Sequence, residues 1–182
     1  MTTDTLRFLE LAAKNSFRHV ELDISKVEEC VQRDGMPALR SKLIENHLKV
    51  VSLNAIENYP ILTDEQMAKS IERCKSIFSL SNRLDCHLVV VNPSEFEPTN
   101  RGLMRQRFDY FVEEAANTAK EYGAQLGFEY VSYDNRVVNT LGKTLESLER
   151  WNVDLRLVLD IFHMYRSKER ISRIPRKAME LL

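Results

Sequence analysis

Short apolar runs alternate with longer segments of helical period along this chain. The runs are rich in β-branched residues and have the length of strands, whereas the segments between them repeat apolar residues at helical spacing. This alternation is typical of a parallel sheet built from βα units. Strands are predicted over residues 18–24, 48–54, 85–92, 124–131 and 153–160.

The predicted helices carry apolar stripes that would pack on the sheet. Asp64 is expected to cap one helix, Pro37 to occupy a first turn, and Gly123 to end a helix in the left-handed conformation. The chain is expected to open on a helix and to close on another over residues 174–182. The clearest stripes are Met67, Ile71, Cys74 and Phe78 in one segment and Met104, Phe108, Phe111, Ala115, Ala119 and Tyr122 in another.

Composition places the chain among globular proteins. Its 182 residues are 43% hydrophobic and carry a formal charge of −1, so residues 1–182 are expected to form a single domain with one core. Mixed charge argues against nucleic acid as a partner. No segment reaches the roughly 20 apolar residues of a membrane span, and the N-terminus lacks the pattern of a signal peptide. The three cysteines form no CxxC pair and are expected to be reduced, which favours the cytoplasm.

Polar side chains recur where the predicted strands end. In parallel α/β sheets, ligands bind at the C-terminal ends of the strands, where loops vary over a rigid scaffold. A buried carboxylate is costly unless it is paired or bound to metal, so the repetition of such residues indicates a site. The residues concerned are Glu21, Asp23, Asn54, Asn92, Glu129 and Asp160.

The segment LVLDIFHMYR holds the sharpest local signal. Asp160 ends a predicted strand, and His163 and Arg166 follow three and six positions later. At that spacing the side chains of Asp160 and His163 can point into the same opening at the strand ends, where they would bind a divalent ion, or the ion and its ligand. Glu129 ends the preceding strand, so two adjacent strands present carboxylates toward one point. The competing interpretations are a half-buried histidine at 163 and a solvated loop arginine at 166.

The motifs GFEYV, VNT before a helix, and LVLDIFHMYR resemble the xylose isomerase-like TIM barrels of the sugar phosphate isomerase/epimerase family. SLNAI is similar to the inosose isomerase and ketose 3-epimerase members. The resemblance runs over nearly the whole chain. It implies an α/β fold of the (β/α)8 TIM barrel type, a divalent metal cofactor (Mn²⁺, Mg²⁺, Co²⁺ or Zn²⁺), and a sugar, polyol or sugar phosphate as the small-molecule partner.

The resemblance also implies roles for single residues. Glu129 and Asp160 would bind the metal, and Glu129 would also be the catalytic acid/base. His163 would contact the substrate or the metal, and Arg166 would suit an anionic or polyol substrate. The implied reaction moves a proton through an enediolate while the metal polarises the carbonyl. The further strand-end residues expected to bind substrate are Asn54, Asn92 and Glu21.

The chain departs from the family pattern in its number of strands. Numbered by the family, its strands are the second to the sixth, and strands 1, 7 and 8 are missing, with the seventh-strand His and the eighth-strand Glu. The expected fold is therefore a partial, truncated barrel of about five parallel strands with flanking helices, where a closed barrel has about 250 residues. Exposed sheet edges would favour a homo-oligomer or another chain that supplies the missing strands.

Several alternatives stay open. A non-catalytic partial barrel, as a structural or binding protein, would have lost its ligands with the missing strands. A dehydratase of the same fold could use the same metal and carboxylate to expel a β-hydroxyl group. The endonuclease branch needs additional His ligands and a DNA-binding surface, which the near-neutral charge disfavours. A five-stranded flavodoxin-like sheet would bind its ligand at one switch point rather than carry polar residues at every strand end.

Overall fold

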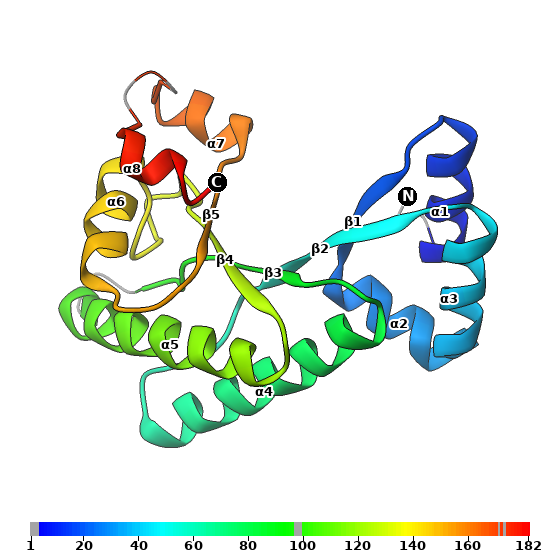
Figure 1. Cartoon of the computed structure of the whole chain (residues 1–182). Helices are drawn as coiled ribbons and strands as arrows, with labels where there is room; N and C mark the ends of the chain where they lie inside the picture. Colours follow the sequence, from blue (N-terminus) through cyan, green and yellow to red (C-terminus); the bar gives the residue numbers. More distant parts are fainter. Residues whose placement is uncertain (1–3, 97–99, 171, 173) are drawn as a thin grey trace.

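A computed structural model of the chain describes residues 4–96, 100–170, 172 and 174–182. Five parallel strands form one sheet in the order β1-β2-β3-β4-β5, so each strand lies beside its neighbour in the sequence. Within the described residues β1 does not pair with β5, and the sheet is open (Figure 1). The strands are β1 (His19–Asp23), β2 (Lys49–Ile56), β3 (Leu88–Val91), β4 (Gln125–Glu129) and β5 (Arg156–Val158).

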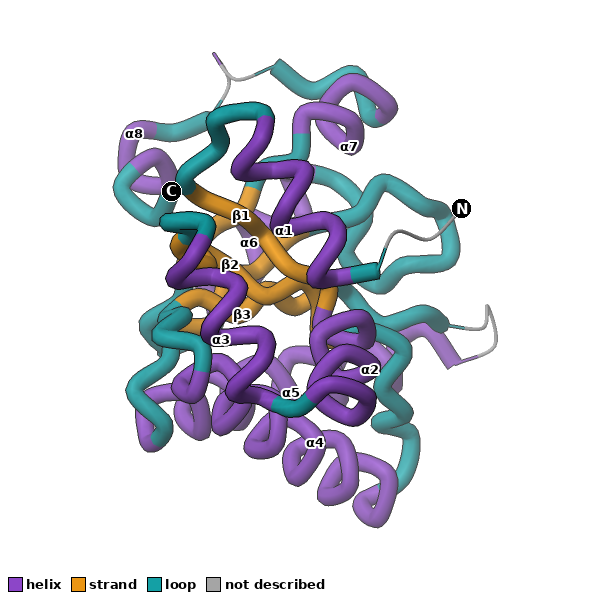
Figure 2. The backbone as a smooth tube through the Cα atoms, turned by 90° about the vertical axis from the view of Figure 1, so that its right-hand side faces the viewer, coloured by secondary structure: helices purple, strands orange, loops and turns teal. Residues whose placement is uncertain are grey.

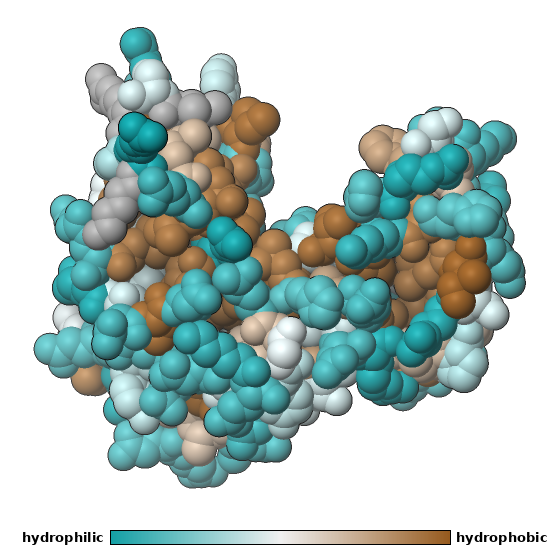
Figure 3. Space-filling model, viewed as in Figure 1, coloured by the Kyte–Doolittle hydropathy of each residue, from teal (hydrophilic) through white to brown (hydrophobic). Residues whose placement is uncertain are grey.

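Helices connect the strands, as parallel pairing requires. The two long helices α4 and α5 cover one face of the sheet, whereas α1 to α3 gather at its β1 end and α6 to α8 at its β5 end (Figures 1 and 2). The molecule is hollowed between these two ends, and apolar side chains line the walls of the hollow (Figure 3). The helices are α1 (Thr5–Lys14), α2 (Ile24–Asp34), α3 (Met36–Glu45), α4 (Asp64–Arg83), α5 (Arg101–Glu121), α6 (Leu141–Arg150), α7 (Ile161–Arg166) and α8 (Arg176–Met179).

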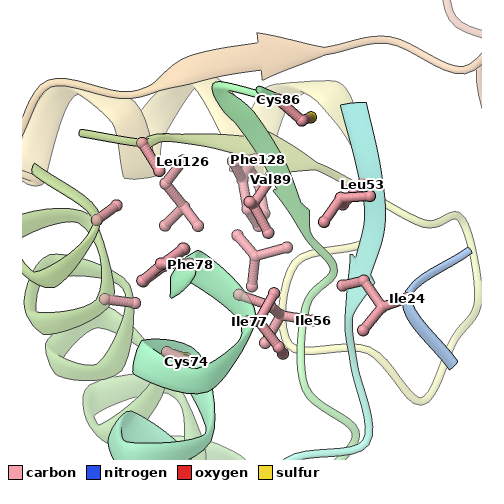
Figure 4. Packing of buried hydrophobic residues seen from close by; sticks show 14 of the residues in the cluster. Ile24, Leu53, Ile56, Cys74, Ile77, Phe78, Cys86, Val89, Leu126 and Phe128 are labelled. Carbon is pink, nitrogen blue, oxygen red and sulfur yellow. The ribbon is translucent and has the colours of Figure 1, made fainter. Parts of the chain in front are cut away.

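The main core lies between the sheet and the two long helices. Val89 and Phe128 from the strands are fully buried together with Phe78 of α4 (Figure 4). Phe128 also packs edge-on against Trp151, with ring centroids 5.1 Å apart. The Trp151 Nε1 donates a 2.9 Å hydrogen bond to Asp109 of α5. Successive strand residues point to opposite faces of a sheet. The strand residues next to Val89 and Phe128 in the sequence therefore point to the face away from α4 and α5.

The β1–β2 pair contains a shift of register. Val20 lies opposite Val50, but Glu21 lies opposite Ser52, so Val51 is an extra residue in β2. Such a bulge changes which side chains of a strand share a face with those of its partner. Here it aligns the polar residues of β2 with those at the end of β1.

The fold confirms the predicted strands and helical stripes, with shorter ends at most strands and two more residues at the end of β2. Pro37 lies in the first turn of α3, and Gly123 follows α5 with a φ of +66°, both as expected. The expected cap at Asp64 is wrong. Thr63 caps α4, because its side chain accepts the Gln66 N–H while the Gln66 side chain accepts the Thr63 N–H.

The expected closing helix over residues 174–182 is also too long. Helix α8 ends at Met179, and the Leu181 carbonyl accepts a 2.8 Å hydrogen bond from the Leu157 N–H of β5. The last residues therefore lie against the edge strand, where a backbone donor would otherwise lack a partner.

Candidate active site

Polar side chains of three strands meet on the face of the sheet away from the main core. The Glu21 carboxylate of β1 accepts hydrogen bonds from Ser52 Oγ at 2.6 Å and from Asn54 Nδ2 at 3.1 Å, both on β2. Asn54 also lowers the pKa of Glu129 at the end of β4. Asn54 therefore acts on two carboxylates that are more than a hundred residues apart in the sequence.

Glu129 is the most strongly perturbed carboxylate of this cluster. Its side chain is buried, with only 7% of the residue exposed. Burial first, and then the charges of Asp160 and Glu21, raise the Glu129 pKa to about 7, while Asn54 acts in the opposite direction. A carboxyl group with this pKa can both release and accept a proton near neutral pH, as an acid/base catalyst must.

Asp160 lies two residues beyond β5 and caps α7. Its Oδ1 accepts a 2.7 Å hydrogen bond from the Phe162 N–H. Only Oδ1 takes part in this cap, which leaves Oδ2 for another ligand. The Asp160 charge raises the Glu129 pKa, so the two predicted metal ligands lie close enough at the ends of β4 and β5 to interact electrostatically.

The donor set decides which metal would fit. Glu129, Asp160 and Glu21 form no ion pair with a basic side chain among the described residues. No three His, Cys, Asp or Glu side chains of the described chain converge closely enough to hold an ion by themselves. Two carboxylates with water and substrate oxygens suit Mg²⁺ or Mn²⁺, whereas catalytic Zn²⁺ usually takes three protein ligands.

His163 lies in helix α7, not in a loop at the mouth of the site. Its ring is buried, and Nδ1 lies 3.2 Å from the Ser132 backbone N and 3.1 Å from Ser132 Oγ. Burial lowers the His163 pKa, and Arg166 acts in the same direction while Asp160 opposes them. His163 is thus buried within a helix and not half-buried under a loop, and Nε2 is the ring nitrogen left for a ligand.

Arg166 binds the same loop from the end of α7. Its Nε donates a 2.9 Å hydrogen bond to the Ser132 carbonyl, and its guanidinium lies 4.9 Å from the centroid of the Tyr133 ring. These contacts use one face and one nitrogen of the guanidinium. Arg166 therefore fastens α7 to the loop after β4, whether or not it also contacts a substrate.

Two other strand-end residues have local partners. Asp23 caps α2 by accepting the Lys26 N–H at 3.0 Å and also accepts the Ser25 hydroxyl at 2.6 Å. The Asn92 carbonyl accepts the Tyr59 hydroxyl at 2.6 Å, and Asn92 Oδ1 is buried with no hydrogen-bond partner among the described residues. Neither side chain contacts the Glu21, Asn54 and Glu129 cluster through a hydrogen bond.

A cavity of about 380 Å³ lies at the ends of β1 and β2. Asp23 and Asn54 line it from the strands, and Lys69 and Arg73 line it from α4. Its volume is sufficient for a monosaccharide, and Asn54 belongs both to its wall and to the carboxylate cluster.

Two residues of the site, Ser52 and Ser132, are not predicted by the pattern of polar residues at strand ends. Ser52 could have been found, because it lies two positions before Asn54 and a strand places such residues on one face. Ser132 lies in the loop after Glu129, where no periodicity predicts the orientation of a side chain.

Comparison with known proteins supports the fold and the family. A family model described as "Xylose isomerase-like TIM barrel" matches residues 9–180. The chain belongs to this family. No curated protein sequence matches it closely enough to count as a relative.

Solved structures of the same fold are similar over most of the chain. The IOLI protein with a bound zinc atom is 22% identical with a TM-score of 0.82, over 93% of this chain and 62% of that one. D-psicose 3-epimerase from Clostridium cellulolyticum H10 with D-tagatose is 17% identical with a TM-score of 0.81, over 100% and 66%. The probable 3-DHS dehydratase AsbF from Bacillus anthracis is 17% identical with a TM-score of 0.76, over 93% and 62%. The chain thus spans about two thirds or less of the length of these proteins.

Proposed function

We propose that this chain is a divalent-metal-dependent sugar or sugar-phosphate isomerase/epimerase that acts by proton transfer through an enediolate. The observation that carries the proposal is the pairing of Glu129 and Asp160 at the ends of adjacent strands, with Glu129 buried and no basic partner beside either carboxylate among the described residues. The similarity of the chain in fold to a zinc-containing IOLI protein and to an epimerase solved with D-tagatose supports it.

Glu129 would move the proton. Its carboxylate takes a proton from the hydroxyl-bearing carbon next to the carbonyl, which leaves an enediolate. It then returns the proton to the former carbonyl carbon, while the proton of the neighbouring hydroxyl group passes to the former carbonyl oxygen. A divalent cation held by Glu129 and Asp160 would polarise the carbonyl and lower the pKa of that C–H bond. Asn54 lowers the Glu129 pKa and so favours the carboxylate form that takes the proton, and burial keeps bulk water away from it.

The number of bases separates isomerisation from epimerisation. Returning the proton to the adjacent carbon on the same face needs one base, and Glu129 supplies it. Epimerisation adds the proton on the opposite face and needs a second acid. Among the residues proposed to bind substrate, Glu21 is the other carboxylate of the cluster, and Asn54, Asn92, His163 and Arg166 would contact hydroxyl or anionic groups.

The first test measures metal. The purified chain is equilibrated with Mn²⁺, free metal is removed, and bound Mn²⁺ is counted by mass spectrometry. We expect stoichiometric Mn²⁺ in the wild type and almost none in Glu129→Gln/Asp160→Asn. Asp85→Asn is the matched control. The Asp85 side chain is 85% exposed and precedes β3, so it lies at the N-terminal ends of the strands, whereas the proposed site lies at their C-terminal ends. Equal metal in the double variant and the wild type would contradict the proposal.

The second test measures chemistry on the metal-loaded protein in D₂O. We expect Glu129-dependent exchange of one C–H hydrogen in a ketose, an inosose or one of their phosphates, followed by NMR. Loss of water with new olefinic signals would instead identify a dehydratase of the same fold. Metal binding without exchange in any of these substrates would favour the non-catalytic, structural or binding alternative.

We also propose that β1 presents an open edge to a second chain, because within the described residues it pairs with β2 alone. Light scattering over a dilution series tests this, and a monomer at every concentration would contradict it. No helix in the described part of the chain is long and apolar enough to span a bilayer. The described cysteines are free and buried, which supports a cytoplasmic location as a further proposal.

A further inference from the structure

We infer that Ser132 holds His163 as the neutral tautomer with its proton on Nε2, so that His163 meets the substrate as a hydrogen-bond donor and not as a metal ligand. The role toward the substrate rests on the proposed function. The position of the proton does not, since it follows from contacts within the protein.

The direction of one hydrogen bond determines the tautomer. The Ser132 backbone N–H points at His163 Nδ1 over 3.2 Å, and a backbone N–H can only donate. Nδ1 must therefore present its lone pair, and a neutral imidazole then carries its hydrogen on Nε2. The Ser132 hydroxyl, 3.1 Å from the same nitrogen, can donate to that lone pair as well.

The surroundings of the ring hold it in this orientation. Tyr133 and Phe162 pack edge-on against the imidazole, with centroid distances of 5.5 and 5.2 Å. A ring flip would exchange Nδ1 for a carbon next to the Ser132 N–H and would leave that buried donor without a partner. A doubly protonated ring would place two N–H groups against each other, so the contact also disfavours the charged form.

The remaining nitrogen has a defined chemistry. Nε2 makes no hydrogen bond to any of the described residues and can donate to an oxygen of a ligand. A protonated nitrogen has no lone pair for a metal, so an ion bound by Asp160 would not also bind His163. A neutral donor beside the oxygen that becomes negative as Glu129 removes a proton would stabilise that charge. Ser132 is then a positioning residue, acting through His163.

The test reads the proton directly by NMR on the full chain with ¹⁵N-labelled histidine near neutral pH. His163→Gln assigns the signal. We expect a protonated Nε2 and an unprotonated Nδ1 at His163. His87 is an internal control of opposite sign, because its Nδ1 lies 3.3 Å from the Gly123 carbonyl, which can only accept. A proton on Nδ1 of His163, or an equal mixture of tautomers, would overturn the inference.

Addition of Zn²⁺ tests the role of His163 toward metal, and two Ser132 variants test whether Ser132 determines the tautomer. On adding Zn²⁺, a diamagnetic probe, we expect the Nε2–H of His163 to persist, and its loss with a shifted Nε2 would show metal ligation and overturn the assigned role. In Ser132→Pro, which lacks the N–H, the Nδ1–H form should appear, whereas Ser132→Ala should keep the Nε2–H form. An unchanged tautomer in a folded Ser132→Pro would exclude Ser132 as the cause. Failure of metal binding or C–H exchange would remove the proposed function and leave the tautomer as measured.

Discussion

The hydroxyl of Ser52 donates a 2.6 Å hydrogen bond to the carboxylate of Glu21 across the β1–β2 pair. Asn54, two residues further along β2, donates to the same carboxylate at 3.1 Å. One strand thereby supplies two donors that fix the position of Glu21, and the charge of Glu21 in turn raises the pKa of Glu129. The cluster is coupled, so a change in one member is expected to reach the others.

Ser52→Ala is expected to lower the free energy of unfolding by about 1 to 2 kcal/mol, because it removes a buried donor to a charged group. Urea denaturation at neutral pH measures this. Ser76→Ala on the exposed face of α4 is the control and should cost nothing or stabilise slightly, since alanine favours the helix. An equal effect of the two substitutions would show that the Ser52 bond contributes nothing of its own.

Glu129→Gln is expected to stabilise the metal-free protein above neutral pH. The ordinary carboxyl pKa is 4.5 and burial raises that of folded Glu129 to about 7, so the folded state holds a proton that the unfolded state has lost. The contribution of Glu129 to the stability of the wild type therefore falls as pH rises from 4.5 to 7, by at most about 3 kcal/mol, and is constant above 7. The neutral amide of the Glu129→Gln variant does not ionise and carries no such penalty.

Thermal unfolding of both proteins in EDTA from pH 4 to pH 8.5 checks this. The variant should gain on the wild type between pH 4.5 and 7, with a constant difference above that window. Parallel curves across the whole range would mean that Glu129 titrates at its ordinary pKa.

Gly127→Ala is expected to destabilise the protein by about 1 kcal/mol through crowding on the face of the sheet that carries the site. A Cβ at this position would lie 3.0 Å from Val158 Cγ2 and 3.1 Å from Leu88 Cδ1. Both are side-chain ends, which can move by a few tenths of an ångström, so the cost should be modest.

A double-mutant cycle with Val158→Ala, followed by urea denaturation, measures the coupling. Gly127→Ala should cost less in the Val158→Ala background, where the nearest atom is gone. Gly142→Ala in α6 is the control, because no atom lies within 4 Å of its Cβ, and it should stabilise the helix. Identical costs of Gly127→Ala in both backgrounds would exclude this contact as the cause.

Arg166→Ala is expected to cost about 1 kcal/mol, through the lost hydrogen bond to Ser132 and the lost stacking on Tyr133. Arg166→Lys keeps the charge but lacks the planar Nε donor, so it should recover only part of the loss. Urea denaturation compares both with Arg170→Ala, an exposed arginine later in the chain. A full recovery by lysine would assign the effect to charge alone.

The sequence predicted the fold well because its signals were local. Strand runs and helical stripes were read from residues close together, and each of the five strands formed where expected. β5 kept only three residues, Arg156–Val158, since pairing with β4 ends at Val158 and Asp160 turns to cap α7. Strand length depends on partners, and no partner can be read from one segment.

The site was predicted less completely, for the same reason. Glu129, Asp160, Glu21 and Asn54 follow from their places at strand ends, and the structure gives them mutual contacts or charge coupling. The sequence predicts that His163 points toward the site but does not predict which residue holds its ring. In the structure Ser132, 31 residues earlier in the chain, makes that hydrogen bond, and the residue spacing does not predict it.

Val51, the extra residue of β2, determines what faces Glu21. If β2 kept Val51 but continued the regular pairing of Val20 with Val50 without a bulge, Glu21 would lie opposite Val51, whose side chain can donate nothing, and Ser52 would lie opposite Leu22. The seryl hydroxyl and the asparagine amide would turn toward the helices, into apolar surroundings. The bulge at Val51 thus sets the phase of β2, because it keeps Ser52 and Asn54 on the face of the sheet that carries Glu21.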